Sequence, residues 1–135
     1  MTESWNKAIK FVLDHEGGLS ENKNDPGGTT NWGISQRAYP SLDIKNLTIE
    51  QAKEIYKKDY WDKLNCDTIP SPMDIIHFDT AVNMGIKRAL SFSAVSNTWQ
   101  DYLFLRIEFY TKLAGAKHYL RGWTRRVLEL WKLCK

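Results

Sequence analysis

Two carboxylic acids near the start of the chain, Glu16 and Asp25, have the residue types and spacing of a catalytic pair. Glu16 follows Val12 by four residues and Leu13 by three, so on a helix it shares the face of these apolar side chains. Burial there and the partial negative charge at a helix C-terminus both favour the protonated carboxyl, which is the form a general acid requires. The alternative is a frayed helix end with Glu16 in water.

Asp25 belongs to an Asp-Pro-Gly-Gly segment. Aspartate is also common in such turns because its side chain hydrogen-bonds to the nearby backbone, whether or not it has a catalytic role. A hairpin that leaves Gly17-Gly18 can fold back over Glu16 and bring the two carboxyls together. Glycosidases place two such groups on either side of the scissile bond, one to donate a proton and one to activate water or attack the sugar. The pair therefore indicates glycosidase chemistry, with either inverting or retaining stereochemistry.

The residues after this turn carry groups that suit water or sugar. Thr29, Thr30 and Asn31 offer hydroxyls and an amide that could hold a nucleophilic water, or they supply ordinary turn polarity. Trp32 is either a wall for sugar stacking or an anchor in the core of the hairpin. Aromatic residues make up 13% of the chain, including six Trp and six Tyr, which mildly favours carbohydrate binding.

The elements that must position these residues are mostly helices. Helical apolar spacing and capping signals predict helices over 4–16, from Thr48 (a capping box with Gln51), from Ser71-Pro72, over 92–113 and over 121–133. Gly85 is expected to break or bend the third of these. Residues 19–34 have no helical period and dense turn signals, so the predicted fold class is mainly α with a small β-hairpin excursion around residues 19–34.

The composition is that of an ordinary globular protein, with 42% apolar and 26% charged residues in 135 and no linker or repeat, which predicts one domain over 1–135. The net charge of +3 comes mostly from the C-terminal stretch. There Glu129 faces an excess of cations: Lys117, Arg121, Arg125, Arg126, Lys132 and Lys135. This excess indicates either solubility alone or attraction to a polyanion such as cell-wall polymers or nucleic acid.

The first ten residues contain no long apolar run, so we expect no signal peptide, synthesis in the cytoplasm and no insertion into a membrane. Cys66 and Cys134 are far apart, and their spacing leaves the question of a disulfide open. His15 and His77 lack a second histidine at helical spacing. We therefore expect neither a metal nor another cofactor.

Several segments together resemble the N-acetylmuramidases of glycoside hydrolase family 108, in the order of that family. They are F-V-L-D-H-E-G-G-L (11–19), D-P-G-G-T-T-N-W-G-I-S (25–35), Tyr60-Trp61, F-D-T-A-V-N-M-G (78–85) and G-W-x-x-R (122–126). The combination of E-G-G with the D-P-G-G segment is highly specific. The part from 72 to 135 resembles the peptidoglycan-binding segment of the family, in shortened form.

This resemblance implies a lysozyme-like fold and hydrolysis of the β-1,4 bond after N-acetylmuramic acid, in the setting of a phage or prophage endolysin. Glu16, Asp25 and Thr30 match the catalytic positions. We predict that the glycan strand contacts a set of polar and aromatic side chains: Asn31, Trp32, Gln36, Tyr60, Asn83 and Trp123. The partner implied is peptidoglycan, the expected state is a monomer, and the enzyme would reach the wall after the membrane is opened.

Some alternatives stay open on the residues alone. A lytic transglycosylase would need the acid but no second carboxylate, and a non-catalytic wall-binding module would need neither. Asn83 suits either an acetamido contact or a helix kink near Gly85, and Trp123 suits either the core or a sugar wall. Asp79, on an apolar helix, is expected to pair with an arginine such as Arg126. A nucleic-acid binder lacks support, because no recognition-helix motif is present.

Overall fold

A computed structural model describes residues 2–21 and 27–135, and this part of the chain is helical apart from one short hairpin. Its elements are α1 (Glu3–Glu16), β1 (Thr30–Asn31), β2 (Ile34–Ser35), η1 (Ile44–Asn46), α2 (Ile49–Tyr56), η2 (Lys57–Trp61), η3 (Cys66–Thr68), α3 (Met73–Met84), α4 (Ile86–Val95), α5 (Trp99–Lys112) and α6 (Ala116–Cys134). The predicted mainly α class with a small hairpin is confirmed.

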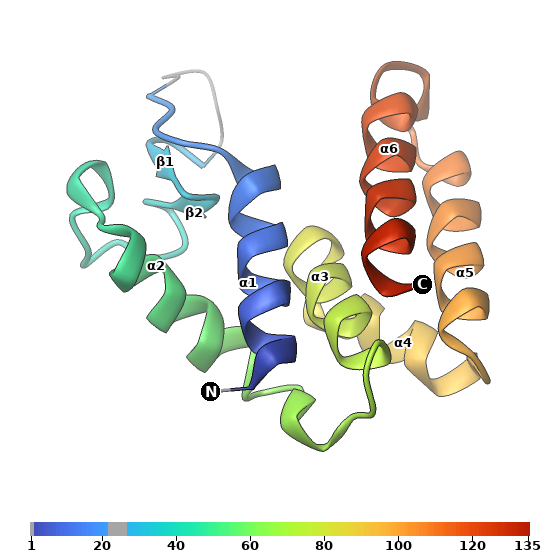
Figure 1. Ribbon diagram of the computed structural model, residues 1–135. Helices are drawn as coiled ribbons and strands as arrows, with labels where there is room; N and C mark the ends of the chain where they lie inside the picture. The colour runs from blue at the N-terminus through green and yellow to red at the C-terminus, as the bar shows by residue number, and fades with distance from the viewer. Residues whose placement is uncertain (1, 22–26) are drawn as a thin grey trace.

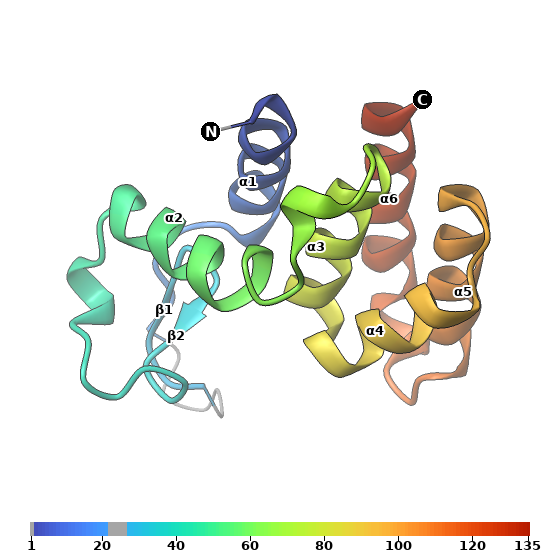
Figure 2. The ribbon, with the colours of Figure 1, turned by 90° about the horizontal axis from the view of Figure 1, so that it is seen from below.

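The central helices divide the molecule into two sides. Both ribbon views place α1 and α3 between the hairpin with α2 on one side and α5 with α6 on the other (Figure 1, Figure 2). Helix α3 is buried nearly all round because its residues are apolar or internally paired. It packs against α1, α4 and α5, so it is the element on which both sides are built. Within the described residues, no helix is both long and apolar enough to cross a membrane.

Helix α1 forms as its apolar period predicts. The Thr2 hydroxyl caps its first turn by accepting from the Trp5 backbone N–H at 3.1 Å. Its buried stripe consists of Trp5, Ala8, Ile9, Val12 and Leu13. The helix ends at Glu16 because Gly17 adopts a φ of 77°, a conformation that glycine takes without steric cost.

The hairpin is short and is tied to its surroundings by side chains. Strand β1 pairs antiparallel with β2, and Trp32 and Gly33 form the turn between them with φ values of 54° and 79°. The Asn31 amide donates to the carbonyl of Ile44 at 3.2 Å and also to the carbonyls of Lys45 and Leu47. The Asn31 side chain therefore fastens the hairpin to η1 and to the residue that follows it.

Two predictions on helix boundaries are wrong. Ser71 does not cap α3, which begins at Met73 without a side-chain cap; the Ser71 hydroxyl instead accepts from the Ser4 hydroxyl at 3.2 Å. The single helix predicted over 92–113 is two helices, because the Thr98 hydroxyl caps α5 and the chain is extended at that residue. The capping box at the start of α2 and the break at Gly85 are confirmed.

A buried charge network joins α3, α5 and α6. Asp79 of α3 is 1% exposed and accepts from Arg106 Nη1 at 2.7 Å and from Arg126 Nη2 at 2.8 Å. Burial alone would raise the pKa of Asp79, but attraction to the two arginines and their hydrogen bonds lower it below its usual value. Pairing of Asp79 with Arg126 was predicted, whereas the second cation, Arg106, was not.

We predict that Asp79→Ala destabilises the protein by about 3–5 kcal/mol, because it leaves two arginines buried without their shared counter-charge. Urea unfolding followed by circular dichroism measures the free energy of unfolding. Glu108→Ala is the matched control, since Glu108 pairs with Lys112 on the exposed surface of α5. Equal stability of the two variants would show that the network does not hold the three helices together.

Candidate active site

Glu16 is the last residue of α1, and its side chain is 23% exposed. Its Oε1 accepts from Arg126 Nη1 at 2.8 Å. Among the described residues, no other side chain is hydrogen-bonded to this carboxyl. Glu16 is therefore held in one orientation, with one oxygen anchored and the carboxyl still open to solvent on one side; the frayed end with Glu16 in free water is not observed.

The guanidinium of Arg126 serves two carboxylates at once. Its Nη2 and Nε groups donate to Asp79, and its Nη1 donates to Glu16. Burial lowers the pKa of Arg126, but attraction to Asp79 and Glu16 outweighs burial and raises that pKa above its usual value. Arg126 is thus a fixed cation, and it links the end of α1 to α3 and α6.

The hairpin turn touches the stem of the same glutamate. A Cβ built on Gly33 would lie 2.6 Å from Glu16 Cβ and 2.6 Å from the Tyr56 hydroxyl, closer than atoms can approach. Gly33 also has a φ of 79°, which favours glycine. Only glycine therefore allows the turn to close against Glu16 as it does here.

Two tyrosines from α2 and η2 lie within electrostatic reach of Glu16. The Tyr56 hydroxyl donates to the Trp32 carbonyl at 2.8 Å, and burial followed by the charge of Glu16 raises the pKa of Tyr56. For Tyr60, burial, Asp59 and Glu16 raise the pKa in that order. The two rings lie 5.8 Å apart. Both phenols stay neutral near physiological pH; the proton of Tyr56 is engaged by the Trp32 carbonyl, while the hydroxyl of Tyr60 can donate a hydrogen bond.

Next to Tyr60 the surface is hollowed between the two sides of the molecule. This hollow, of about 330 Å³, is lined by Tyr39, Asp59, Tyr60, Lys63, Gly85 and Ile86. The Tyr39 hydroxyl donates to Asp59 Oδ2 at 2.5 Å, which fixes the carboxylate on one wall. The lining combines an aromatic face with polar groups, as sugar-binding clefts do, and it connects the α2 side with the α3–α4 junction.

The polar residues predicted around the hairpin mostly brace it. Thr30 is half-buried, and its backbone pairs with Ser20. The Trp32 indole donates to the Leu47 carbonyl at 3.2 Å, and the Gln36 amide donates to the carbonyls of Tyr39 and Leu42. Asn31 is buried against η1, as described above. Contacts of these side chains with a glycan stay predictions.

The remaining predicted residues lie elsewhere. Asp25 lies outside the described residues. Asn83 accepts from the Tyr110 hydroxyl, and Trp123 stacks on Tyr110 with ring centroids 5.1 Å apart, so both belong to the α3–α5–α6 side. Trp123 is half-buried. A glycan contact by either residue stays a prediction.

Sequence reasoning missed the role of two residues that shape this site, Gly33 and Tyr56, and one contact, that of Arg126 with Glu16. The G-W-x-x-R motif singled out Arg126, but nothing local indicated that it reaches two acids. Among residues 2–21 and 27–135, no group of three or more His, Cys, Asp or Glu side chains could hold a metal ion.

The helical scaffold thus carries a fixed carboxyl at the end of α1, and the charge of this carboxyl acts on Tyr60, which lines the polar, aromatic hollow. The family model described as "Glycosyl hydrolase 108" matches residues 9–85, more than half of the chain. The chain therefore belongs to glycosyl hydrolase family 108. The matched segment contains Glu16, Gly33, Tyr60 and Asp79.

A solved structure supports this assignment. The chain is similar to the structure of Brucella abortus SagA, with 26% sequence identity, a TM-score of 0.79, and coverage of 95% of this chain and 91% of that chain. No curated protein sequence matches the chain. The lysozyme-like helical fold is thereby confirmed, and membership of the family makes the protein a glycosidase that degrades peptidoglycan.

We predict that Gly33→Ala lowers glycan hydrolysis by roughly a hundredfold, because displacing a catalytic group by about 1 Å costs that much. The new methyl group would push on Glu16 Cβ and the Tyr56 hydroxyl. Turbidity loss of purified peptidoglycan measures the rate. Gly18→Ala is the control, since a Cβ there meets nothing within 4 Å. A fully active Gly33→Ala would show that the turn does not position Glu16.

Proposed function

We propose that the protein hydrolyses the β-1,4 bond between N-acetylmuramic acid and N-acetylglucosamine, with Glu16 as general acid. The observation that supports this most is the Glu16 carboxyl itself, which is anchored through one oxygen by Arg126 at 2.8 Å, is 23% exposed, and lies within electrostatic reach of Tyr60 in the lining of the hollow. A proton donor must be oriented before the substrate arrives, and this arrangement supplies that orientation.

Arg126 and Asp79 set the charge around the Glu16 carboxyl. With Glu16 ionised, the charges of Glu16, Arg126, Asp79 and Arg106 sum to zero. In the proposed step the Glu16 carboxyl gives its proton to the leaving oxygen, and Arg126, at 2.8 Å, stabilises the carboxylate that remains.

The hollow beside Tyr60 is the proposed place for a sugar of the strand. Its aromatic face can stack on a pyranose ring, while Asp59 and Lys63 can bind hydroxyl or acyl groups. Asp59 is already oriented by Tyr39, so little ordering is needed on binding. Asp25 and Thr30 remain the proposed groups that activate and hold the attacking water, on the opposite face of the sugar.

The biological setting is also part of the proposal. A peptidoglycan hydrolase of this family suits the role of a phage or prophage endolysin, made in the host cytoplasm and released to the wall when the membrane is opened. Helix α6 supplies Arg126 to Glu16, so the C-terminal segment 72–135 contributes to the same site. This contact supports one domain over 1–135, and a monomer is the proposed state of that domain.

We predict that Glu16→Gln lowers the release of reducing sugar ends from purified peptidoglycan by about a hundredfold to ten-thousandfold, the range expected for a lost general acid. Glutamine has nearly the same size as glutamate, but its amide is not acidic enough to protonate the leaving oxygen. Glu3→Gln, at the exposed start of the same helix, is the control and should retain full activity. Substantial activity in Glu16→Gln would exclude Glu16 as the acid.

Asp25→Ala distinguishes hydrolysis from the transglycosylase alternative. A hydrolase needs a second group to activate its water, so we expect Asp25→Ala to lower the rate of hydrolysis by at least about a hundredfold. Mass analysis of the wild-type products should show reducing ends. A lytic transglycosylase would yield 1,6-anhydro ends and would keep its rate in Asp25→Ala. These two results together would show that the protein is a lytic transglycosylase and not a hydrolase.

A further inference from the structure

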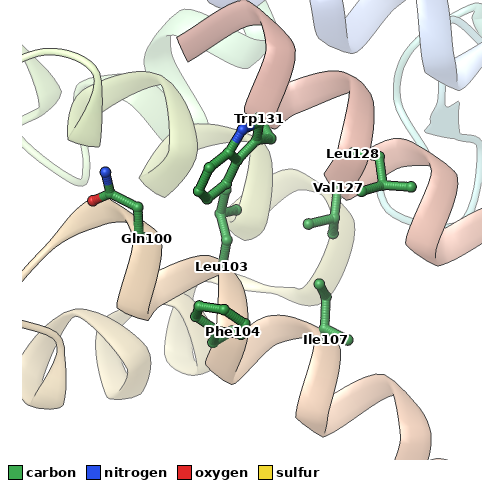
Figure 3. A pocket seen from close by; sticks show the side chains of 7 residues that line it. All are labelled: Gln100, Leu103, Phe104, Ile107, Val127, Leu128 and Trp131. Atoms are coloured by element: carbon green, nitrogen blue, oxygen red, sulfur yellow. The ribbon is translucent and has the colours of Figure 1, made fainter. Parts of the chain in front are cut away.

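An apolar groove runs between α5 and α6. Its lining is apolar except for one amide: Gln100, Leu103, Phe104, Ile107, Val127, Leu128 and Trp131 (Figure 3). Phe104 is 67% exposed and Leu128 is 54% exposed, although both side chains are large and apolar. Exposed apolar residues gathered in one place, rather than scattered, mark an interaction surface.

Cations border this groove on the outer face of α6. Leu128 also lines a second, shallow hollow with Leu120, Arg121, Thr124 and Arg125, so the apolar and the basic regions meet at Leu128. Arg121, Arg125, Leu128 and Lys132 recur at helical spacing and are all exposed. The surface thus alternates between apolar and cationic side chains.

The acids near this surface are largely engaged elsewhere. Glu129 of α6 pairs with His15 of α1 at 2.6 Å, and Glu108 of α5 pairs with Lys112 at 3.3 Å. Asp101 lies in the first turn of α5, where the helix dipole favours a negative charge. Arg126 faces the interior, but Arg121 and Arg125 have no ion-pair partner among the described residues. Arg121 and Arg125 are therefore exposed cations without an ion-pair partner on this face, among the described residues.

We propose that the α5–α6 surface binds an anionic lipid bilayer, with Arg121, Arg125 and Lys132 on the phosphates and with Phe104 and Leu128 in the interfacial layer. Helices that lie in a bilayer interface typically combine Leu, Phe and Trp with Arg and Lys. The groove holds about 200 Å³ and is lined mainly by apolar side chains, which suits a segment of an acyl chain.

This surface is separate from the candidate active site. Helices α5 and α6 lie at the end of the molecule away from the hairpin and α2 (Figure 1, Figure 2). None of the five residues of the proposed lipid contact lines the hollow beside Tyr60 or is hydrogen-bonded to Glu16. A bilayer bound to this surface would therefore hold the enzyme at a membrane without covering the residues that line the hollow beside Tyr60.

Vesicle co-sedimentation of the full chain tests the proposal. We expect binding to phosphatidylglycerol-containing vesicles, little binding to pure phosphatidylcholine vesicles, and release at high salt. The double variant Arg121→Gln/Arg125→Gln should lower partitioning roughly 25-fold, since each basic residue near an anionic bilayer contributes about fivefold. Phe104→Ser/Leu128→Ser should lower it as well. Lys10→Gln/Lys58→Gln removes the same charge from exposed positions on α1 and η2 and should have a much smaller effect.

Hydrolysis of lipid-free peptidoglycan by every variant reports on folding and on the separate active site, and it should equal that of the wild type. Equal vesicle binding by Arg121→Gln/Arg125→Gln and wild type would overturn the proposal. So would binding that Phe104→Ser/Leu128→Ser leaves intact, which would indicate a purely electrostatic polyanion site. A dimer in sedimentation analysis that Phe104→Ser/Leu128→Ser abolishes would assign the groove to a second copy of the chain instead.

Discussion

The placement of one guanidinium between two carboxylates is the constraint on which the rest of the molecule depends. Arg126 neutralises the buried Asp79 and, with its remaining N–H group, anchors Glu16. The central helix, the last helix and the end of the first helix therefore meet at a single side chain. Because the same group closes the core and orients the proposed general acid, a change at Arg126 is expected to affect both the stability and the activity of the protein.

The parts of the fold that could be predicted are those set by local pattern. The apolar stripe of α1 placed Glu16 at a helix end, because a period of 3.6 residues is visible within one segment. The capping box of Thr48 and Gln51 marked the start of α2 for the same reason. An acid in the apolar middle of helix α3 required a cation, which made Asp79 and Arg126 a predictable pair.

The parts that sequence reasoning missed depend on contacts between distant segments. The approach of Gly33 to Glu16 and Tyr56 follows from how the hairpin docks, and a glycine after a tryptophan does not reveal it. The apolar period ran on through residues 92–113, so the cap at Thr98 did not stand out. Asn31 looked like a candidate for holding water, yet its amide is used to fasten the hairpin to η1.

The Glu16–Arg126 contact also joins residues that are made at very different times. The two residues are separated by 110 positions in the chain. A growing chain that has not yet exposed α6 outside the ribosome has its acid but no arginine to hold it. The enzyme thus gains its oriented acid only when synthesis of the domain is nearly finished.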